Sequence, residues 1–516
     1  MTARSGTRSP TDARAAGRVA VVGAGAVGMT LAGRLAQHGA EVELFEAEPA
    51  HGRIGSRAIC MQRETLEIWA RLGIGQQVAD RGVRWRVGRT YHRGRELFSV
   101  TLPHSNEHFP PFVNISQTEV EELLERRLGE LGVPIHRRHR LTSLAQDADG
   151  VDAVFETDGG PLTRRVAWLV GADGAHSAVR HAMGTGFPGY TFDDRFLIAD
   201  IRAELPFTNE RHFHFDPPWN PGRQVLIHPQ PDGIWRIDWQ VPSHTDADAE
   251  RAGGGLDRRI RQVVGDATRY ELVWMTAYRF SQRLADAFVD RRVALAGDAA
   301  HVMSPFGARG LNSGAADAEN LAWRLATVAR GDAPAALLAG YTRERRGAAI
   351  ENLAATDATM RFMAPHGPLR RAWRDLVLRL APRSAWFRAR VNSGRLAEPA
   401  RYVASGPGDP ALPRHGTVAP DLRLADGSRL REHLGRGFAI VAPAPLEAGL
   451  PVVAVGTGSV YGAERAWLVR PDGYLAGSRP LAEASALAGL ARASQADEGG
   501  EGQQRESEQH DRRGAG

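Results

Sequence analysis

Three glycines near the N-terminus, Gly23, Gly25 and Gly28, follow a short apolar strand at 19–22 and open a helical stretch. In such a pattern the first glycine permits a tight turn and the second lets the backbone approach a pyrophosphate. The third lets the helix pack closely on the strand. Because the positive end of the helix then faces the phosphates, the spacing predicts a dinucleotide site. A glycine turn without a ligand is the structural alternative.

Glu46 ends a second strand at 41–46, close to the usual spacing of about 20 residues after the glycines. A carboxylate at this position accepts a hydrogen bond from a ribose 2′-hydroxyl and repels a 2′-phosphate. The first segment therefore favours the ADP portion of NAD or FAD over that of NADP.

Two further acidic residues follow apolar strands. Asp173 and Gly174 come after the strand at 168–170, and Asp298 comes after the strand at 293–296. An aspartate at a strand end can accept hydrogen bonds from a ligand while the glycine keeps the backbone close to it. For Asp173, a helix N-cap followed by a glycine turn is an equally good interpretation.

A loop with Pro305 and Gly310 leads from Asp298 into a helix, for which Asn312 or Ser313 is the expected N-cap. The N-terminus of this helix points back toward the strand that carries Asp298. Its positive end can stabilise a developing anion, such as the one on a reduced flavin.

These three segments, in this order, resemble the class A flavoprotein aromatic hydroxylases, the p-hydroxybenzoate hydroxylase-like FAD monooxygenases. The resemblance covers roughly residues 18–395. It implies bound FAD, with NADH or NADPH as a transient reductant. It also implies hydroxylation of a small phenolic substrate by O₂ through a flavin C4a-hydroperoxide. The cofactor activates the oxygen, and the protein orients the reactants and excludes water.

The resemblance assigns a role to several residues around the cofactor. Glu46 would hold the adenosine ribose, and Arg57 would approach the pyrophosphate or ribityl region. Gln117, which heads the helical stretch QTEVEELLERRL, would lie on the ribityl side. Asp173 would lie near the pyrophosphate and any NAD(P)H path, and Asp298 would bind ribityl hydroxyls.

The resemblance also places the loop after the third strand beside the flavin ring. Pro305 would border the isoalloxazine on the substrate side, while Leu311 and Asn312 would present backbone N–H groups to its pyrimidine edge. Many members carry Gly-Gly-Gln-Gly after the proline, whereas this chain has Gly307-Ala308-Arg309-Gly310. Pro305 and Arg309 are therefore the candidate catalytic residues. Arg309 binds an acidic substrate or an NAD(P)H phosphate, or it pairs with a carboxylate.

The strands expected within 190–285 match the sheet that covers the substrate pocket in this family. Apolar and polar residues alternate along one of them: Trp235, Ile237 and Trp239 against Arg236, Asp238 and Gln240. The candidate substrate-binding residues are Tyr190, His212, His214, Arg223 and His228. A single strand histidine is also commonly structural. His212 and His214 share a strand face, but no third ligand accompanies them, so no metal is expected.

The expected fold class is mixed α/β, a Rossmann-type FAD-binding domain with an interleaved β-sheet substrate domain and a C-terminal thioredoxin-like domain. The expected units are as follows: a disordered arm (1–17), the first part of the FAD-binding domain (18–185), the substrate sheet (186–285), the return segment with helices (286–400), a linker (401–414), the thioredoxin-like domain (415–490) and a disordered tail (491–516). The last domain contains no cysteine, which excludes dithiol chemistry.

All 65 basic residues are arginines, which excludes Schiff-base and P-loop lysine chemistry. The net charge is +5, but arginines and acids are interleaved, so no nucleic-acid partner is expected. The single cysteine, Cys60, fits a cytoplasmic location. No apolar run is long enough to span a membrane. A homodimer is a candidate assembly.

Three alternatives stay open from the sequence. A Baeyer–Villiger or epoxidising monooxygenase on the same scaffold would act on a nonphenolic substrate. A flavin-binding protein without turnover would keep the cofactor residues but lack a substrate. An NAD-dependent dehydrogenase would share the first glycine motif, but the segment from Asp298 to Asn312 argues against it.

Overall fold

The computed structural model describes residues 17–496 except 51–57, 103–106, 208, 306, 364, 366, 385, 388–390, 392–397 and 403–411. The expectations for Arg57, for the N-terminal arm before residue 17 and for the tail beyond residue 496 therefore lie outside the described residues. Among the described helices, none combines the length and the apolar character that crossing a membrane requires.

A six-stranded sheet forms the base of the molecule, with β1 at its centre between β11 and β2, and parallel to both. The strand order is β17 (Val289–Asp290), β18 (Val293–Leu295), β11 (Trp168–Gly171), β1 (Val19–Val22), β2 (Val42–Phe45) and β7 (Ile135–His136). The central strands are buried and apolar because protein covers both faces of the sheet.

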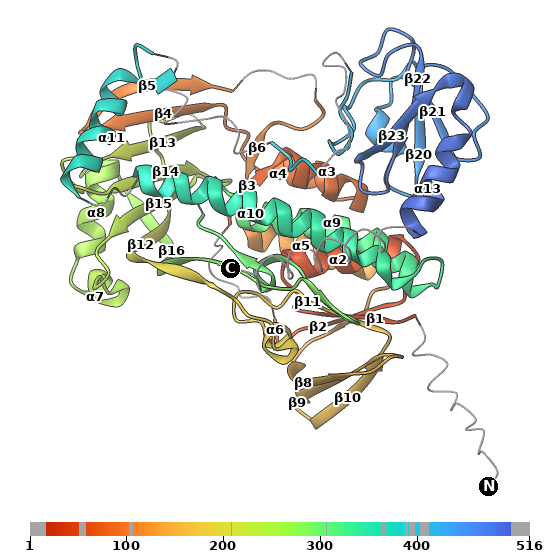
Figure 1. Ribbon diagram of the computed structural model, residues 1–516. Coiled ribbons are helices and arrows are strands. Elements are labelled where there is room, and N and C mark those ends of the chain that lie inside the picture. The colour runs from red at the N-terminus through yellow and green to blue at the C-terminus, as the bar shows by residue number, and fades with distance from the viewer. Residues whose placement is uncertain are drawn as a thin grey trace, which may run out of the picture.

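Different structures cover the two faces (Figure 1). One face carries α2 (Ala26–Gln37), α5 (Gln117–Glu130) and α9 (Arg309–Ala329), and α2 packs on the other two. A three-stranded sheet, β8 (Arg140–Gln146), β9 (Val151–Thr157) and β10 (Gly160–Val166), lies on the side away from these helices. Short α6 (Ala178–Met183) packs between β11 and β8.

A second sheet of eight strands stands beside the first (Figure 1). Its order is β19 (His301–Val302), β16 (Tyr270–Leu284), β12 (Gly189–Ala203), β15 (Ile234–Val241), β14 (Gln224–Pro229), β13 (Glu210–Phe215), β4 (Val87–His92) and β5 (Arg95–Thr101). β4 and β5 join it from within the range that sequence analysis assigned to the FAD-binding part. β4 runs parallel to β13, so the two units are interleaved more deeply than expected.

One face of this second sheet is apolar and covered by helix. Trp235, Ile237 and Trp239 pack there with Leu256 and Ile260 of α8. α7 (Ala247–Ala252) precedes α8 (Gly255–Val264). The opposite face also carries apolar residues, among them Phe196 and Leu226, and it borders the cavity described below.

The remaining helices connect the two sheets. They are α3 (Arg63–Leu72), α4 (Gly75–Arg81), α10 (Leu338–Met363) and α11 (Pro368–Leu380). The long α10 crosses from the first unit to the second (Figure 1). The short pair β3 (Cys60–Gln62) and β6 (Phe112–Asn114) lies between the units.

The C-terminal unit has its own sheet, in the order β21 (Val452–Ala454), β20 (Ala439–Ala442), β22 (Arg465–Val469) and β23 (Leu475–Pro480), followed by α13 (Ala486–Ala496). β21 is parallel to β20, and β22 is antiparallel to it. The connection at 443–451 contains no helix. Its thioredoxin-like character stays a prediction.

A cluster of buried charges in the first unit also contacts the backbone of the C-terminal unit. Glu319 of α9 pairs with Arg34 of α2 at 2.7 Å and with Arg71 of α3 at 2.9 Å. Arg34 also donates a hydrogen bond to the carbonyl of Gly435 across 2.9 Å. Because each charge has a partner, the desolvation cost of this buried cluster is offset.

Candidate active site

One cavity connects the two units. It has a volume of about 360 Å³ and lies between the start of α2, the loop before α9 and the face of the eight-stranded sheet opposite α8. Gly25 borders it at one end, and Arg211, His228 and Asp238 border it at the other. A dinucleotide site and a sheet-lined pocket are thus parts of a single space.

The three glycines of the first motif differ in what surrounds them. A Cβ on Gly23, whose φ is +104°, would lie 2.5 Å from the carbonyl oxygen of Ala172, and one on Gly28 would lie 1.9 Å from that of Gly23. A Cβ on Gly25 would meet no described atom closer than 3.7 Å. Gly23 and Gly28 therefore serve the turn and its packing, whereas Gly25 opens toward the cavity. This is the geometry that a pyrophosphate requires.

Glu46 lies beside this glycine loop. Its carboxylate accepts hydrogen bonds from the backbone N–H groups of Ala24, at 2.7 Å, and Glu48, at 2.9 Å. A carboxylate has about four lone-pair positions, so Glu46 keeps acceptor capacity for a ribose hydroxyl. The position expected from the spacing is thus where an ADP ribose would need it.

Glu121 of α5, which sequence analysis did not select, places its carboxylate at the start of α2. Its Oε1 accepts from the backbone N–H of Ala26 at 3.2 Å and from the side-chain amide of Gln117 at 2.8 Å. A carboxylate is stabilised at this positive helix end. Gln117 itself lines the cavity, as expected for a residue beside the cofactor.

Asp173 uses its carboxylate within its own turn. It accepts from the hydroxyl of Ser177 at 2.5 Å and from the backbone N–H of Val179 at 3.1 Å, and burial raises its pKa. Ala172 and Gly174, but not Asp173, border the cavity. Ser177, not Asp173, is the N-cap of α6, so the N-cap interpretation of Asp173 is wrong; Asp173 instead supports that cap, while Gly174 borders the cavity.

Asp298 lines the cavity on a turn that a neighbouring aspartate holds in place. Asp317 accepts from the backbone N–H of Gly297 at 3.0 Å, and it pairs with His301 at 2.6 Å and with Arg345 at 2.7 Å. Burial alone would raise the pKa of Asp317, but His301 and Arg345 hold it down at about 2. The turn that presents Asp298 is thus fixed by a buried ion network.

The helix after this turn begins earlier than expected. α9 starts at Arg309 with Ala308 as its N-cap, so the expected N-cap at Asn312 or Ser313 is wrong. Ala308 has a φ of +53°, and its N–H bonds to the carbonyl of Pro305 at 2.9 Å. This tight turn already ends the loop, so that Asn312 falls within the first turn of α9.

The side chain of Asn312 instead joins α9 to neighbouring elements. Its oxygen accepts from the backbone N–H of Gln62 at 2.9 Å and from the hydroxyl of Thr65 at 2.6 Å, while its amide donates to the carbonyl of Cys60 at 2.9 Å. Pro305, Gly310, Leu311 and Asn312 all line the cavity. The loop assigned to the flavin by resemblance is therefore in place.

Arg309 lies on the same wall of the cavity and donates a hydrogen bond to the side-chain oxygen of Asn352 in α10. Burial lowers its pKa, with Glu351 acting in the opposite direction. Its guanidinium thus links the flavin loop to α10.

Of the five substrate candidates, only His228 borders the cavity. His212 lies 3.3 Å from a carboxylate oxygen of Glu210, and His214 stacks on Tyr91 with ring centroids 4.4 Å apart. These two histidines were misplaced because alternate residues of β13 face opposite sides of the sheet, and it is Arg211 that faces the cavity.

The other two candidates lie outside the cavity as well. Tyr190 is 44% exposed, and its hydroxyl bonds to Asp357 and Gln282. Arg223 pairs with Asp194 at 3.5 Å. Both therefore hold neighbouring chain segments together instead of forming part of the pocket wall.

The sheet contributes charged residues that the sequence analysis did not select: Arg211, Arg236 and Asp238. The alternation along β15 indicates which side chains face the cavity. Its apolar residues, including Trp235 and Trp239, pack on α8, so the polar residues between them face the other way. In a sheet covered on both faces, the polar half must face a ligand or an internal partner. Trp85 and Phe112, whose rings stack 5.3 Å apart, add an aromatic wall.

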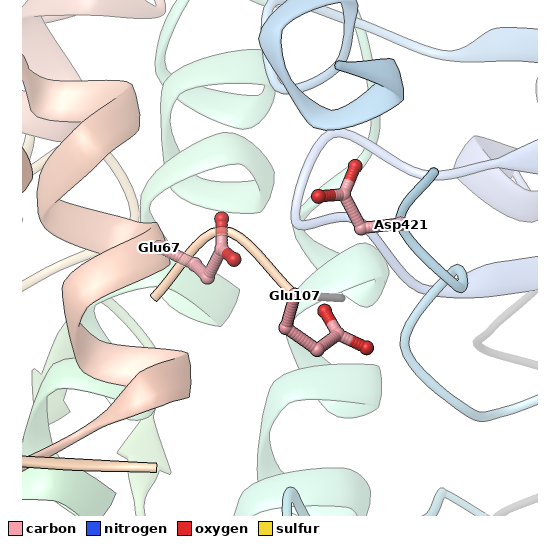
Figure 2. Close-up of side chains that lie close together, drawn as sticks. All are labelled: Glu67, Glu107 and Asp421. Carbon is pink, nitrogen blue, oxygen red and sulfur yellow. The ribbon is translucent and has the colours of Figure 1, made fainter. Parts of the chain in front are cut away.

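A group of three carboxylates lies elsewhere, at the boundary with the C-terminal unit. Glu67, Glu107 and Asp421 point toward one another (Figure 2). Arg431 pairs with Glu67 at 2.7 Å, and its backbone N–H donates to Asp421 at 3.2 Å, while Arg429 pairs with Asp421 at 2.5 Å. Arginines thus pair with two of the three carboxylates, and the group forms part of the contact between the two units.

Comparisons with known proteins agree with this geometry. A 3-(3-hydroxy-phenyl)propionate/3-hydroxycinnamic acid hydroxylase from Comamonas testosteroni is 32% identical over 70% of this chain, which spans 61% of that relative's length. A 12-dehydrotetracycline 5-monooxygenase/anhydrotetracycline 6-monooxygenase from Streptomyces rimosus subsp. rimosus is 31% identical over 89% of this chain and 94% of its own.

A solved structure shows the same fold. The OxyS anhydrotetracycline hydroxylase from Streptomyces rimosus superimposes with a TM-score of 0.76 and 27% identity, over 93% of this chain and 99% of that one. The expected mixed α/β class with an FAD-binding domain is confirmed. A family model described as an FAD binding domain matches residues 17–356, which include the glycine loop, both turns and α9. The chain belongs to this FAD binding domain family.

Proposed function

We propose that this chain is an FAD-dependent monooxygenase that consumes NADH or NADPH and hydroxylates an aromatic substrate with O₂. One observation carries the proposal. A single cavity runs from the open glycine Gly25 to a sheet face with aromatic and charged side chains. A cofactor held at the first end would therefore meet a substrate at the second without leaving the protein.

The residues at the first end fit FAD. The backbone around Gly25 and the start of α2 would hold the pyrophosphate, Glu46 the adenosine ribose, and Gln117 and Asp298 the ribityl chain. The N-terminus of α9, with Gly310 and Leu311, would face the flavin ring. When bound, FAD supplies the redox chemistry that connects NAD(P)H, O₂ and the substrate.

The residues at the second end would orient the substrate and exclude water. Trp85, Tyr278 and Phe280 supply aromatic surface, and Pro305 borders the ring site from the opposite side. Apolar walls strengthen every electrostatic contact within the cavity. The hydroxylase name of one curated relative and the monooxygenase name of the other support an aromatic substrate.

Three further expectations stay predictions. The cytoplasm is the expected compartment, on the basis of the single cysteine Cys60. A homodimer remains the candidate assembly. The role of the C-terminal unit is structural, because its Arg431 pairs with Glu67 of α3 and its Arg470 pairs with Glu344 of α10, which hold it on the first unit.

The test begins with the purified chain. Visible flavin absorbance, and FAD released on denaturation, are expected. Addition of phenols should stimulate NADH or NADPH oxidation, and isotopically labelled O₂ should deliver label to the aromatic product. A protein that binds FAD but never oxidises NAD(P)H would be a non-catalytic binder. Label recovered only in an ester or epoxide would instead identify the alternative monooxygenase classes.

A further inference from the structure

Charged side chains form a row across the cavity face of the eight-stranded sheet. His228 of β14 pairs in register with Arg236 of β15, which pairs with Asp200 of β12. On the other side, the register of β13 with β14 places Arg211 next to His228. Asp238 lies two residues after Arg236 along β15, and so its side chain is on the same face of the sheet.

The two arginines of this row differ in their partners. Arg236 makes a two-pronged ion pair with Asp200, with both contacts at 2.7 Å, and the side-chain amide of Gln230 also donates to Asp200. Arg211 makes no ion pair within the described residues, and its Nε is buried without a hydrogen-bond partner there. Its guanidinium carbon lies 6.0 Å from the ring centroid of Trp85 and 5.7 Å from that of Phe213.

Two more buried polar atoms of this face lack hydrogen-bond partners among the described residues: Oδ1 of Asp238 and Nδ1 of His228. Leaving such atoms unsatisfied is costly, so this pattern points to a ligand that completes them. Burial raises the pKa of Asp238 to about 7, against the opposing charge of Arg236. Burial lowers the pKa of His228 well below its usual value, so His228 is neutral.

The charge balance selects the kind of ligand. With Asp238 ionised, its charge and that of Arg211 cancel. A carboxylate ligand would add a net negative charge to an apolar cavity, which is expensive. A phenol adds no net charge, and its hydroxyl has a proton to give. Arg211 then offers donors to the oxygen, and Asp238 offers an acceptor for the proton.

We propose that Arg211 and Asp238 form the subsite for the phenolic hydroxyl of the aromatic substrate. The phenol O–H bond breaks, the proton moves to the Asp238 carboxylate, and the electron pair stays on the phenol oxygen as a phenolate held by Arg211. His228 lines the same cavity. This inference rests on the proposed function and adds the residues of this chain that would bind and ionise the phenolic hydroxyl.

The test uses FAD-loaded protein and 2-naphthol, with 2-methoxynaphthalene as the matched probe that lacks the proton. Binding is followed by the change in flavin absorbance. The wild type should bind the naphthol at least tenfold more tightly than the ether, which follows from one hydrogen bond to a charged group. It should also bind it more tightly than 2-naphthoate, which carries a carboxylate instead.

The pH profile separates proton transfer from simple binding. In the complex, Asp238 and the phenol share one proton. The affinity for 2-naphthol should therefore be constant just above about pH 7, where free Asp238 is ionised, and should fall about tenfold for each pH unit below it, where free Asp238 carries a proton that binding must release. In Asp238→Asn the phenol must release its proton to solvent. Naphthol binding should then keep strengthening up to the phenol pKa of about 10. If Asp238 had only a structural role, the midpoint of the profile, which is the pH at which the affinity for 2-naphthol levels off, would be the same in Asp238→Asn and in the wild type.

Arg211→Met should weaken 2-naphthol binding by about tenfold to a hundredfold and weaken binding of the ether less, because the ether oxygen accepts from Arg211 but never takes on the charge of a phenolate. Arg223→Met is the matched control, because it removes an arginine of the same sheet that lies outside the cavity. FAD content and melting temperature show whether each variant is folded. The Asp238→Asn profile keeps the test valid even if Arg211→Met does not fold.

Three results would overturn the subsite: equal affinity for the naphthol and the ether, tighter binding of 2-naphthoate, or an unchanged midpoint in Asp238→Asn. None of these affects FAD loading or label transfer from O₂, which are the readouts for the proposed function. The two proposals therefore fail independently.

Discussion

Arg345 of α10 pairs with Asp317 of α9 at 2.7 Å, and both side chains are almost completely buried. The same carboxylate holds His301 and the backbone of Gly297. One acidic side chain thus connects the two long helices to the turn that carries Asp298 into the cavity.

Asp317→Asn should destabilise the protein by about 3–5 kcal/mol, because it leaves the buried charge of Arg345 without a counterion. Thermal or denaturant unfolding measures this change. Asp80→Asn is the control, since it removes an exposed pair with Arg84 and should change little. Similar losses from the two substitutions would contradict the role given to the network.

Acid should weaken this network in the wild type. The folded pKa of Asp317, at about 2, is depressed below its usual 3.8, so its contribution is full above about pH 4 and declines as the pH falls toward 2. Asp317→Asn has no such contribution to lose. The difference in melting temperature between the two proteins should therefore narrow over that interval, as calorimetry across the acid range would show.

The glycine loop predicts two separable defects. Gly25→Leu should leave the fold intact and abolish FAD binding, because the side chain enters open cavity space and no described atom lies within 3.7 Å of the new Cβ. Gly28→Ala should instead lower stability, because its Cβ would overlap the carbonyl of Gly23. FAD stoichiometry and circular-dichroism melting distinguish the two. A Gly25→Leu protein that retains full FAD would disprove the phosphate assignment.

Glu121→Gln should tighten FAD binding by up to about fivefold. The carboxylate now occupies the positive end of α2, where it competes with the pyrophosphate, and such a charge contributes about 0.3–1 kcal/mol. The apoprotein should melt at a lower temperature for the same reason. Titration of apoprotein with FAD tests this, with Glu122→Gln on the exposed side of α5 as the control. Weaker FAD binding in Glu121→Gln would show that the acid assists the cofactor.

Asp238 should give the opposite pH dependence to Asp317. Its folded pKa of about 7 lies above the usual 3.8, so its ionisation disfavours the fold progressively as the pH rises from about 4 through 7. Asp238→Asn should therefore melt at a higher temperature than wild type above pH 7, and the difference should vanish below about pH 4. A difference in melting temperature between the two proteins that is the same at every pH would contradict a buried position for this carboxyl.

The turn, the helix start and the acid assigned to the cofactor could be located from the sequence because local rules govern them. The turn at Gly23, the helix start at Gly25 and the acid Glu46 follow from strand–turn–helix geometry within one short segment. Arg57 falls outside the described residues. The N-cap of α9 was misplaced, because the left-handed turn at Ala308 uses a residue type that rarely adopts it.

The substrate end could not be located from the sequence in the same way. Which residues of β13 and β14 face the cavity depends on strand register and on what covers the other face. Both are set by distant elements such as α8. His212 and His214 were chosen for their chemistry, while Arg211, between two polar neighbours, gave no local indication of its direction.

The alternation along β15 also limits how this site can change in evolution. A one-residue insertion or deletion before Trp235 would turn Trp239 into the cavity and drive Asp238 into the apolar layer on α8. Such an event would destroy the fold and the pocket together. Substrate range in this lineage should therefore diversify by replacement at the cavity-facing positions of the strand, whereas strand length stays constant.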